Sequence, residues 1–175
     1  YIQKFENVDG LVTNKKNKVL MLSFADCTPL LFYDPVRNVI ANTHSGWKGT
    51  LQEIGVRTVE KMQKEYACNP EDIICCIGPH IRKCHFEVDS DVKDLFYNKF
   101  KELEGIEDII KYNSEKNKYY IDTATINKKI LLNTGLKEEN IIDSNICTVC
   151  NSDICHSFRA EKELSGRSVA IIKLI

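Results

Sequence analysis

Apolar residues are grouped along the chain into short runs that end at turn signals. The runs 18–24 and 28–33 predict strands, the second as a continuation or partner of the first. After the turn "DPVRN" at 34–38, the run 39–44 predicts a further strand. The runs on either side of this turn therefore predict a β-hairpin.

The remaining elements follow from helical spacing, caps and further apolar runs. Helices are predicted from Gly49 or Thr50 through Tyr66, over 89–102, and over 123–134 with Asp122 as N-cap and Gly135 as stop. Further strands are predicted at 72–77, 118–121, 140–144 and 168–175. The polar stretch from 104 to 117 predicts irregular structure. The near-continuous apolar run at 168–175 predicts a closing strand that is buried on both faces.

Strands and helices alternate irregularly in this prediction, and a hairpin is mixed in with them. The fold class is therefore α/β, with a mixed β-sheet layered with helices. No internal repeat or low-complexity linker divides the 175 residues, so we expect a single domain over 1–175.

Composition narrows the class of protein. The net charge of −1 argues against a broad nucleic-acid surface, and no apolar run approaches the roughly 20 residues of a membrane helix. Eight cysteines would suit a disulfide framework, but no signal peptide opens the chain, and Cys75 and Cys76 are adjacent within a predicted strand. We therefore expect reduced cysteines in a cytoplasmic protein.

Cys27 and His44 lie seventeen positions apart, each next to an end of the predicted hairpin. Thiolate and imidazole are good ligands for zinc or copper, and a hairpin would bring both side chains to one edge of the sheet. The alternative is a small buried cysteine and a hydrogen-bonded core histidine. By spacing alone this structural alternative is favoured.

The segment "SGWKGT" leads into the first predicted helix. Gly46 and Gly49 flank Trp47 and Lys48, and a tight turn of this kind presents backbone N–H groups that suit an anion such as phosphate. Glycines that serve only the geometry of the turn explain the segment equally well.

Two further segments carry potential ligands. The loop 77–88 contains His80, Cys84 and His85, although alternation with Phe86 and Val88 would place Cys84 on the packed side of a short strand. In the segment 147–167, the residues Cys147, Cys150, Cys155 and His156 resemble a zinc knuckle with unusually short spacing between its two pairs. Arg159 and Arg167 follow; their guanidinium groups suit a phosphate or carboxylate, or surface salt bridges.

Four segments taken in order, "ADCTPLLFYDP", "HSGWKGTL", "IGPHIRKCHFEV" and "SFRAEKELSGR", resemble the laccase-domain family. This family is also called multicopper polyphenol oxidoreductase-like or purine nucleoside phosphorylase. The resemblance covers essentially the whole chain, and the pairing of A-D-C with H-x-G-W-[KR]-G is its most specific part. It implies a mixed α/β fold of the cysteine-hydrolase-like type and a metal site, usually zinc, made by two histidines and a cysteine.

The resemblance assigns Cys27 and His44 as metal ligands. It places the other histidine in a Q-x-H-G motif upstream of A-D-C, but no histidine precedes Cys27 in this chain. We expect that an N-terminal segment carrying it is missing, because "VDGLVTN" at 8–14 matches what normally follows the motif.

The activity that the resemblance implies is zinc-dependent phosphorolysis of adenosine, inosine or methylthioadenosine, with deamination of adenosine as a side activity. A copper-dependent phenol oxidase is the alternative, but four histidines are too few for several copper centres. A metal-binding module without catalysis, and a hydrolase with Cys27 as nucleophile and His44 as base, also remain open. The expected small molecules are a purine nucleoside and phosphate, and the expected assembly is a monomer or homodimer.

Several residues receive roles from these considerations. The candidates for phosphate are Lys48, Arg159 and Arg167, those for stacking on the base are Trp47 and Phe86, and Asp26 is expected to orient a ligand or shuttle a proton. Cys84 matches the family's cysteine before aromatic-Glu-Val and is a weaker candidate. The family's F-F-S-[YH]-R-R departs here to Ser157-Phe158-Arg159-Ala160, so the second arginine is lost. No role follows for Cys147, Cys150, Cys155 or His156.

Overall fold

The computed structural model describes residues 5–175. Its strands are β1 (Gly10–Thr13), β2 (Val19–Phe24), β3 (Thr28–Asp34), β4 (Val39–Ser45), β5 (Ile74–Ile77), β6 (Glu87–Val88), β7 (Ile110–Asn113), β8 (Lys118–Ile121), β9 (Ile141–Asp143) and β10 (Ser168–Lys173). Its α-helices are α1 (Trp47–Leu51), α2 (Ile54–Tyr66), α3 (Ser90–Phe100), α4 (Ile106–Ile109), α5 (Thr123–Leu132) and α6 (Phe158–Glu161). Three 3₁₀ turns complete this description: Pro70–Asp72, Glu138–Asn140 and Lys162–Leu164. The fold is mixed α/β, as predicted.

The central sheet has five strands in the order β1-β4-β3-β5-β9. The predicted hairpin is confirmed, because β3 pairs with β4 antiparallel from Thr28 opposite Ser45 to Asp34 opposite Val39. The pair β5 and β9 is parallel and makes the sheet mixed. Both β5 and β9 are followed by loops that leave the same edge of the sheet, and β3 begins at this edge.

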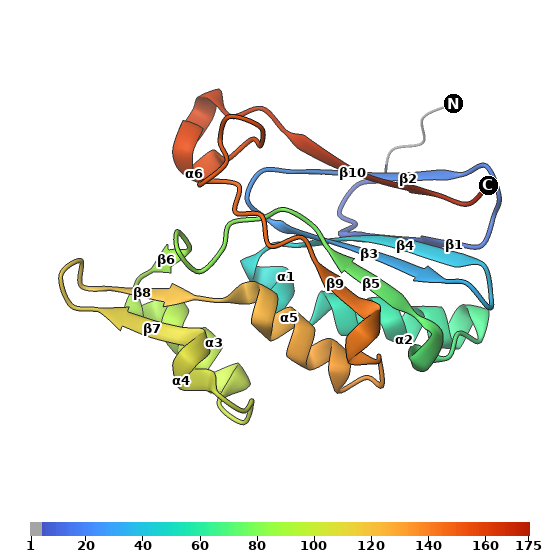
Figure 1. Cartoon of the computed structure of the whole chain (residues 1–175), viewed down its shortest axis with the longest axis horizontal. Helices are drawn as coiled ribbons and strands as arrows, with labels where there is room; N and C mark the ends of the chain where they lie inside the picture. The colour runs from blue at the N-terminus through green and yellow to red at the C-terminus, as the bar shows by residue number, and fades with distance from the viewer. Residues whose placement is uncertain (1–4) are drawn as a thin grey trace.

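Helices and a second sheet cover the two faces of the central sheet. Figure 1 shows α2 and α5 beneath it and the two-stranded sheet of β2 and β10 on the opposite side. The amide of Asn42 in β4 is fully buried between the sheets and donates to the carbonyls of Leu20 and Ala170. A third sheet, β6-β8-β7, lies to one end beside α3 and α4.

The predicted helix over 49–66 forms as two helices. The chain breaks between α1 and α2 at Glu53, whose φ of 55° is left-handed. The helix α2 buries Gly55, Thr58, Val59 and Met62 on one face, so the amphipathic character that the sequence predicted is confirmed. The helix α5 is capped by the carboxylate of Asp122, which accepts from the backbone N–H of Thr125, and Gly135 has a φ of 97°.

Three further predictions about the fold were wrong. The stretch 104–117 contains α4 and β7, because Ile106, Ile109 and Ile110 pack in one hydrophobic cluster with residues of α5, which the polar character of the surrounding sequence concealed. The strand β2 pairs with β10 and not with 28–33. The strand β10 is not buried on both faces, since Val169 and Ile171 are 47% and 57% exposed on the outside of the molecule.

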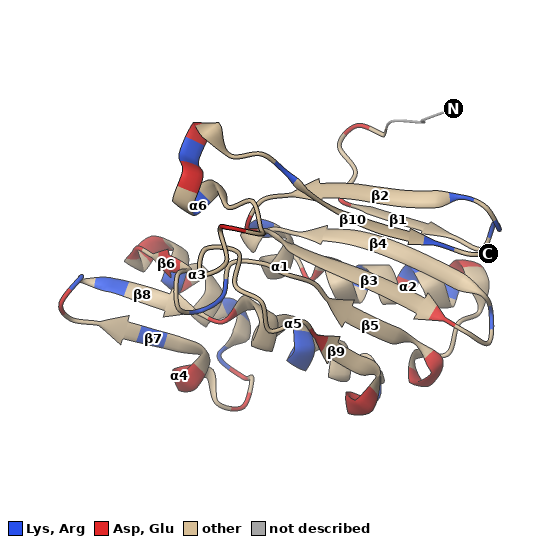
Figure 2. Ribbon diagram, turned by 45° about the horizontal axis from the view of Figure 1, so that its top comes forward, with Lys and Arg blue, Asp and Glu red and all other residues tan. Residues whose placement is uncertain are grey.

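Charged residues are spread over the elements. Figure 2 shows acidic and basic positions interspersed on helices and turns. Among residues 5–175, no helix combines the length and the apolar character that crossing a bilayer requires.

Candidate functional site

A cavity of ≈ 380 Å³ opens where the ends of β2, β3 and β4 meet α1, α6 and the loop after β5. Of the predicted site residues, the structure brings all except Lys48 and the weaker candidate Cys84 to its wall, namely Asp26, Cys27, His44, Trp47, Phe86, Arg159 and Arg167. Because these residues come from five separate segments, only the tertiary fold assembles the cavity.

Cys27 and His44 lie next to each other in this wall. Cys27 directly precedes β3, and His44 pairs with Pro29 across the hairpin. Gly46 lies against both: a Cβ at this position would be 3.3 Å from Sγ of Cys27 and 3.7 Å from Cε1 of His44. The thiol and the imidazole therefore border one point, and a larger residue at 46 would crowd them.

The orientation of the His44 ring is set by a residue that sequence reasoning missed. Nδ1 of His44 lies 3.1 Å from Oδ1 of Asp9, and the backbone N–H of His44 donates to the carbonyl of Asp9 at 2.6 Å. A carboxylate at Nδ1 holds the proton on that nitrogen and leaves the lone pair of Nε2 free for a ligand. The sequence signal that could have identified Asp9 was its place in "VDGLVTN". Asp9 directly precedes β1, which pairs with β4.

The environment of Cys27 disfavours a free thiolate. Burial raises its pKa, and the nearby carboxylates of Asp26 and Asp9 raise it further, while Arg167 opposes them. No hydrogen bond joins this thiol to the His44 ring within the described part of the chain, because Nδ1 faces Asp9. The pair therefore lacks the contact expected of an activated nucleophile and its base, whereas a cation would favour the thiolate.

Asp26 joins three segments of the site. One carboxylate oxygen accepts from the hydroxyl of Thr148 and the other from the backbone N–H of Arg159, both at 2.6 Å. Its carbonyl accepts from the N–H of Ile81 at 2.9 Å, and its φ of 79° is left-handed. Because both of its carboxylate oxygens accept hydrogen bonds, Asp26 is held in this strained backbone conformation just before β3. Thr148 was not singled out from the sequence.

The basic candidates are placed differently. The guanidinium of Arg159 donates from Nη1 to the carbonyl of His85 at 3.0 Å and from Nη2 to that of Glu87 at 3.3 Å, which fixes it at the cavity wall. Arg167 is exposed and donates to the carbonyls of Ser165 and Gly166. Lys48 lies outside the lining, where its ammonium is 5.3 Å from the centroid of the Trp47 ring.

Four aromatic side chains border the cavity, namely Phe24, Trp47, Phe86 and Phe158. Phe86 is buried and packs edge-on against Phe96, which holds its ring in place. Trp47 is half-buried at the start of α1. Phe158, which was not singled out from the sequence, is 52% exposed in the cavity lining. The wall thus combines apolar faces with two cationic groups.

A second group of ligand-type residues lies outside the cavity lining. Cys84, His85, Cys147 and Cys150 direct one donor atom each to a common place, with all four atoms within 4.8 Å of one another. These four residues, called the Cys84 cluster below, have a donor set that suits a metal ion. Within residues 5–175 it is the one group of three or more such donors, so no third donor joins Cys27 and His44 there.

The Cys84 cluster corrects two sequence expectations. Cys155 and His156 do not join Cys147 and Cys150; the ring of His156 packs against Gly166 and faces Glu161 instead. Cys84 is exposed in a turn and not on the packed side of a strand, since β6 begins only at Glu87. The partners of Cys147 and Cys150 are instead Cys84 and His85, which come from the loop after β5.

Comparison with known proteins connects the cavity to a family. The family model described as "Multi-copper polyphenol oxidoreductase laccase" matches residues 2–175. The "Purine nucleoside phosphorylase YlmD" of Bacillus subtilis is 36% identical over 172 residues, which cover 98% of this chain and 60% of that protein. A protein named "Adenosine deaminase RL5", from an unknown prokaryotic organism, is 32% identical over 163 residues, covering 93% of this chain and 61% of that protein.

Solved structures give the same result. YlmD from Geobacillus stearothermophilus superimposes with a TM-score of 0.89 at 30% identity, covering 96% of this chain and 61% of that one. The hypothetical protein YfiH from Bacillus licheniformis gives a TM-score of 0.88 at 34% identity, covering 95% of this chain and 61% of that one. The chain thus spans about three fifths of the length of these relatives.

Proposed function

Because the chain belongs to the family described as multi-copper polyphenol oxidoreductase laccase, we propose that it is a zinc-dependent purine nucleoside phosphorylase. Its substrates would be adenosine, inosine or methylthioadenosine together with phosphate, and adenosine deamination would be a side activity. Relatives named for both activities support this choice.

The observation that carries the proposal is the composition of the cavity wall. A thiol and an imidazole with a free Nε2 lie beside aromatic rings and two arginines, around a volume of ≈ 380 Å³. A nucleoside has an apolar base to stack and a ribose to orient, and phosphate needs cationic donors. The cavity offers a group for each of these parts.

The metal would be held by Sγ of Cys27 and Nε2 of His44. Both are ordinary zinc ligands. The pair fits a cation because burial and the carboxylates of Asp26 and Asp9 disfavour the Cys27 thiolate, and Arg167 is the cationic group that opposes them. A metal ion would supply the positive charge that the thiolate needs. Bound there, zinc supplies a Lewis acid that activates water or polarises a substrate oxygen. Asp9 keeps the His44 ring in the ligating tautomer.

The remaining residues position the substrates. Arg159, fixed by the carbonyls of His85 and Glu87, has further N–H groups available for a phosphate oxygen, and Arg167 provides a second cation. Trp47 and Phe86 would stack on the purine. Phosphate then attacks C1′ of the ribose as the glycosidic bond breaks, so that adenosine yields adenine and ribose-1-phosphate. Asp26 acts as a positioning residue for Arg159.

Two other functions are weaker. Hydrolysis by Cys27 and His44 is disfavoured by the raised pKa of the thiol and by the Asp9 contact at Nδ1. Copper-dependent phenol oxidation is disfavoured because the four histidines of the chain are too few to form several copper centres. Titration with copper, followed by spectroscopy, tests this alternative.

The test is the phosphate dependence of product formation. Zinc-loaded full-length protein, with the segment expected upstream of Tyr1, is incubated with adenosine, with and without inorganic phosphate, and bases and sugars are separated by chromatography. Adenine and ribose-1-phosphate are expected only when phosphate is present. Inosine and ammonia formed without phosphate would establish deamination as the main activity, and no product under either condition would contradict the proposal.

Matched variants assign the activity to the cavity. Cys27→Ser and His44→Ala are expected to abolish product formation. Cys155→Ser and His156→Ala change the same residue types outside the cavity lining and should retain it. Loss of activity in the control variants alone would exclude the Cys27 and His44 pair.

A further inference from the structure

The donor atoms of the Cys84 cluster have the spacing of a tetrahedral metal site. Sγ of Cys84 lies 3.6 Å from Sγ of Cys147 and 3.7 Å from Sγ of Cys150. Nδ1 of His85 lies 3.2, 3.7 and 3.4 Å from the sulfurs of Cys84, Cys147 and Cys150. Tetrahedral zinc, with bonds of about 2.3 Å to sulfur and about 2.0 Å to nitrogen, sets sulfurs roughly 3.8 Å apart and nitrogen roughly 3.5 Å from sulfur. The five separations cluster around these values.

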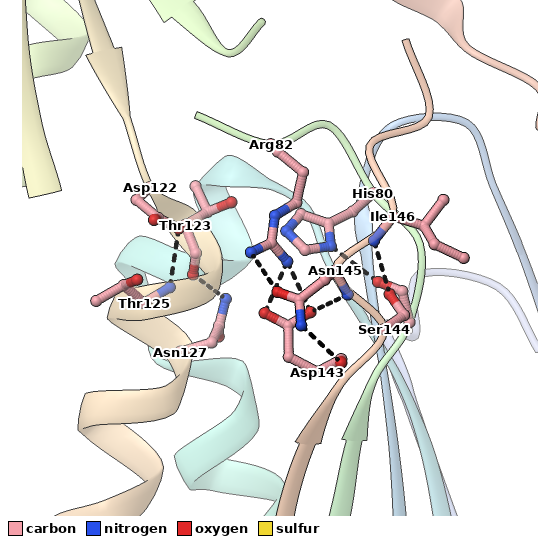
Figure 3. A network of polar contacts seen from close by, with 11 residues as sticks. His80, Arg82, Asp122, Thr123, Thr125, Asn127, Asp143, Ser144, Asn145 and Ile146 are labelled. Atoms are coloured by element: carbon pink, nitrogen blue, oxygen red, sulfur yellow. Dashed lines mark hydrogen bonds and ion pairs between the residues drawn. The ribbon is translucent and has the colours of Figure 1, made fainter. Parts of the chain in front are cut away.

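The backbone holds the cluster together independently of the donors. The loop after β5 and the segment after β9 run side by side: the N–H of His80 donates to the carbonyl of Ile146, and the N–H of Thr148 donates to the carbonyl of His80. Figure 3 shows Arg82 reaching from the first segment to the second. Its guanidinium binds both carboxylate oxygens of Asp143 at 2.6 and 2.7 Å. The donors therefore meet because two anchored loops bring them together.

Hydrophobic packing does not explain the cluster. Cys84 and Cys150 are exposed, whereas structural cysteines are usually buried as small apolar residues. A disulfide does not explain it either, because bonded sulfurs lie about 2.05 Å apart and all three cysteines are free. Exposed thiols that converge on an imidazole gain little unless a cation joins them.

We propose that Cys84, His85, Cys147 and Cys150 form a structural zinc site, separate from the cavity. The four ligands are three thiolates and one imidazole, a complete set that leaves no open position for substrate or water. The softness of the donors and their tetrahedral arrangement favour zinc over the oxygen-preferring cations.

The site lies where it stabilises the cavity wall. His85 supplies the carbonyl that fixes the Arg159 guanidinium, and Thr148, between Cys147 and Cys150, donates to Asp26. Zinc at the Cys84 cluster would join the two loops that carry these contacts. This role does not depend on which reaction the cavity performs.

The experiment measures zinc in the full chain, purified with a phosphine reductant and supplied with Zn²⁺ alone. Mass spectrometry of the metal is expected to show one equivalent lost in Cys84→Ser and Cys150→Ser, relative to the parent protein. Both residues are exposed, so these variants should still fold, which circular dichroism checks. Cys155→Ser and Cys76→Ser, which change cysteines outside the cluster, should keep that equivalent.

Substitution by Co²⁺ separates the two sites. Thiolate-rich Co²⁺ sites absorb in the near ultraviolet by charge transfer from sulfur. This band should keep most of its intensity in Cys27→Ser, which removes one thiol outside the Cys84 cluster, and should lose most of it in Cys150→Ser, which breaks the cluster. A reduced full chain that binds no Zn²⁺, or a band that survives in Cys150→Ser and vanishes in Cys27→Ser, would overturn the proposal.

Discussion

Oδ1 of Asp9 lies 3.1 Å from Nδ1 of His44, although the two residues are 35 positions apart in the chain. The contact exists because β1 pairs with β4, so that the residue before β1 meets the end of β4. It leaves Nε2, the other ring nitrogen, free for a ligand, and Cε1 of the ring lies beside Gly46, which also borders Sγ of Cys27. A residue that was not among the predicted site residues thus determines how His44 can bind a ligand.

We expect Asp9→Ala to reduce kcat/KM for phosphorolysis by about 10–100-fold, the range typical of losing the partner of a ligating histidine. The unfolding free energy should change little, because the Asp9 side chain is 65% exposed. Steady-state kinetics and thermal unfolding measure the two effects. Glu6→Ala, a nearby exposed carboxylate change, is the control. Equal losses in both variants would contradict a specific role for Asp9.

Removing the Thr148 hydroxyl should destabilise the fold. In Thr148→Val the shape is kept, but one oxygen of the Asp26 carboxylate loses its 2.6 Å hydrogen bond. A hydrogen bond to a charged group contributes about 1.5–3 kcal/mol, and we expect a loss of this size in chemical denaturation. Thr148→Ser keeps the hydroxyl and should lose clearly less. If both variants unfold alike, the hydrogen bond does not carry the effect.

The stability of the protein should fall in mild acid because of His80. Burial lowers the pKa of this histidine below its usual 6.5, although the carbonyl of Gly78 opposes the shift. The folded protein keeps His80 neutral while the unfolded chain takes up a proton, so stability is complete above about pH 6.5 and decreases below it. The slope is at most about 1.4 kcal/mol per pH unit, and it ends once the pH falls below the pKa of the folded state.

Denaturation between pH 7 and 5.5 measures this slope. His80→Asn should flatten it, whatever its effect on stability at pH 7. His156→Asn changes an exposed histidine and should leave the slope as it is. An unchanged slope in His80→Asn would assign the acid sensitivity to other groups.

Gly78 ends β5 where the chain touches Pro29. A Cβ at residue 78 would lie 2.7 Å from Cγ of Pro29, and the N–H of Gly78 donates to the carbonyl of Pro29 at 3.0 Å, so neither segment can withdraw easily. We expect Gly78→Ala to lower the unfolding free energy by about 1–3 kcal/mol, as overpacking does. Gly49→Ala, whose Cβ would have contacts of 3.4 Å or longer, should be near neutral. Similar unfolding midpoints for both variants would contradict the clash.

The sequence predicted local structure well where short-range physics dominates. The hairpin of β3 and β4, the helix α5 with its Asp122 cap, and the amphipathic α2 follow from turn chemistry, capping and helical periodicity. The exposed face of β10 was not predicted from the sequence. An apolar run is compatible with a strand buried on both faces or on one face, and only the position of β10 at the outside of the molecule exposes one of its faces.

The candidate site divides in the same way. The sequence by itself determined the family, the ligand-type residues Cys27 and His44, and the segments that carry Arg159 and Arg167. Only the tertiary structure decided their partners: Asp9 behind His44, Thr148 and Arg159 on Asp26, and Lys48 outside the cavity wall. It also replaced Cys155 and His156 by Cys84 and His85 as companions of Cys147 and Cys150. The physical reason is that spacing along a chain governs contacts within a turn or a helix, whereas strand pairing and loop packing determine which distant side chains meet.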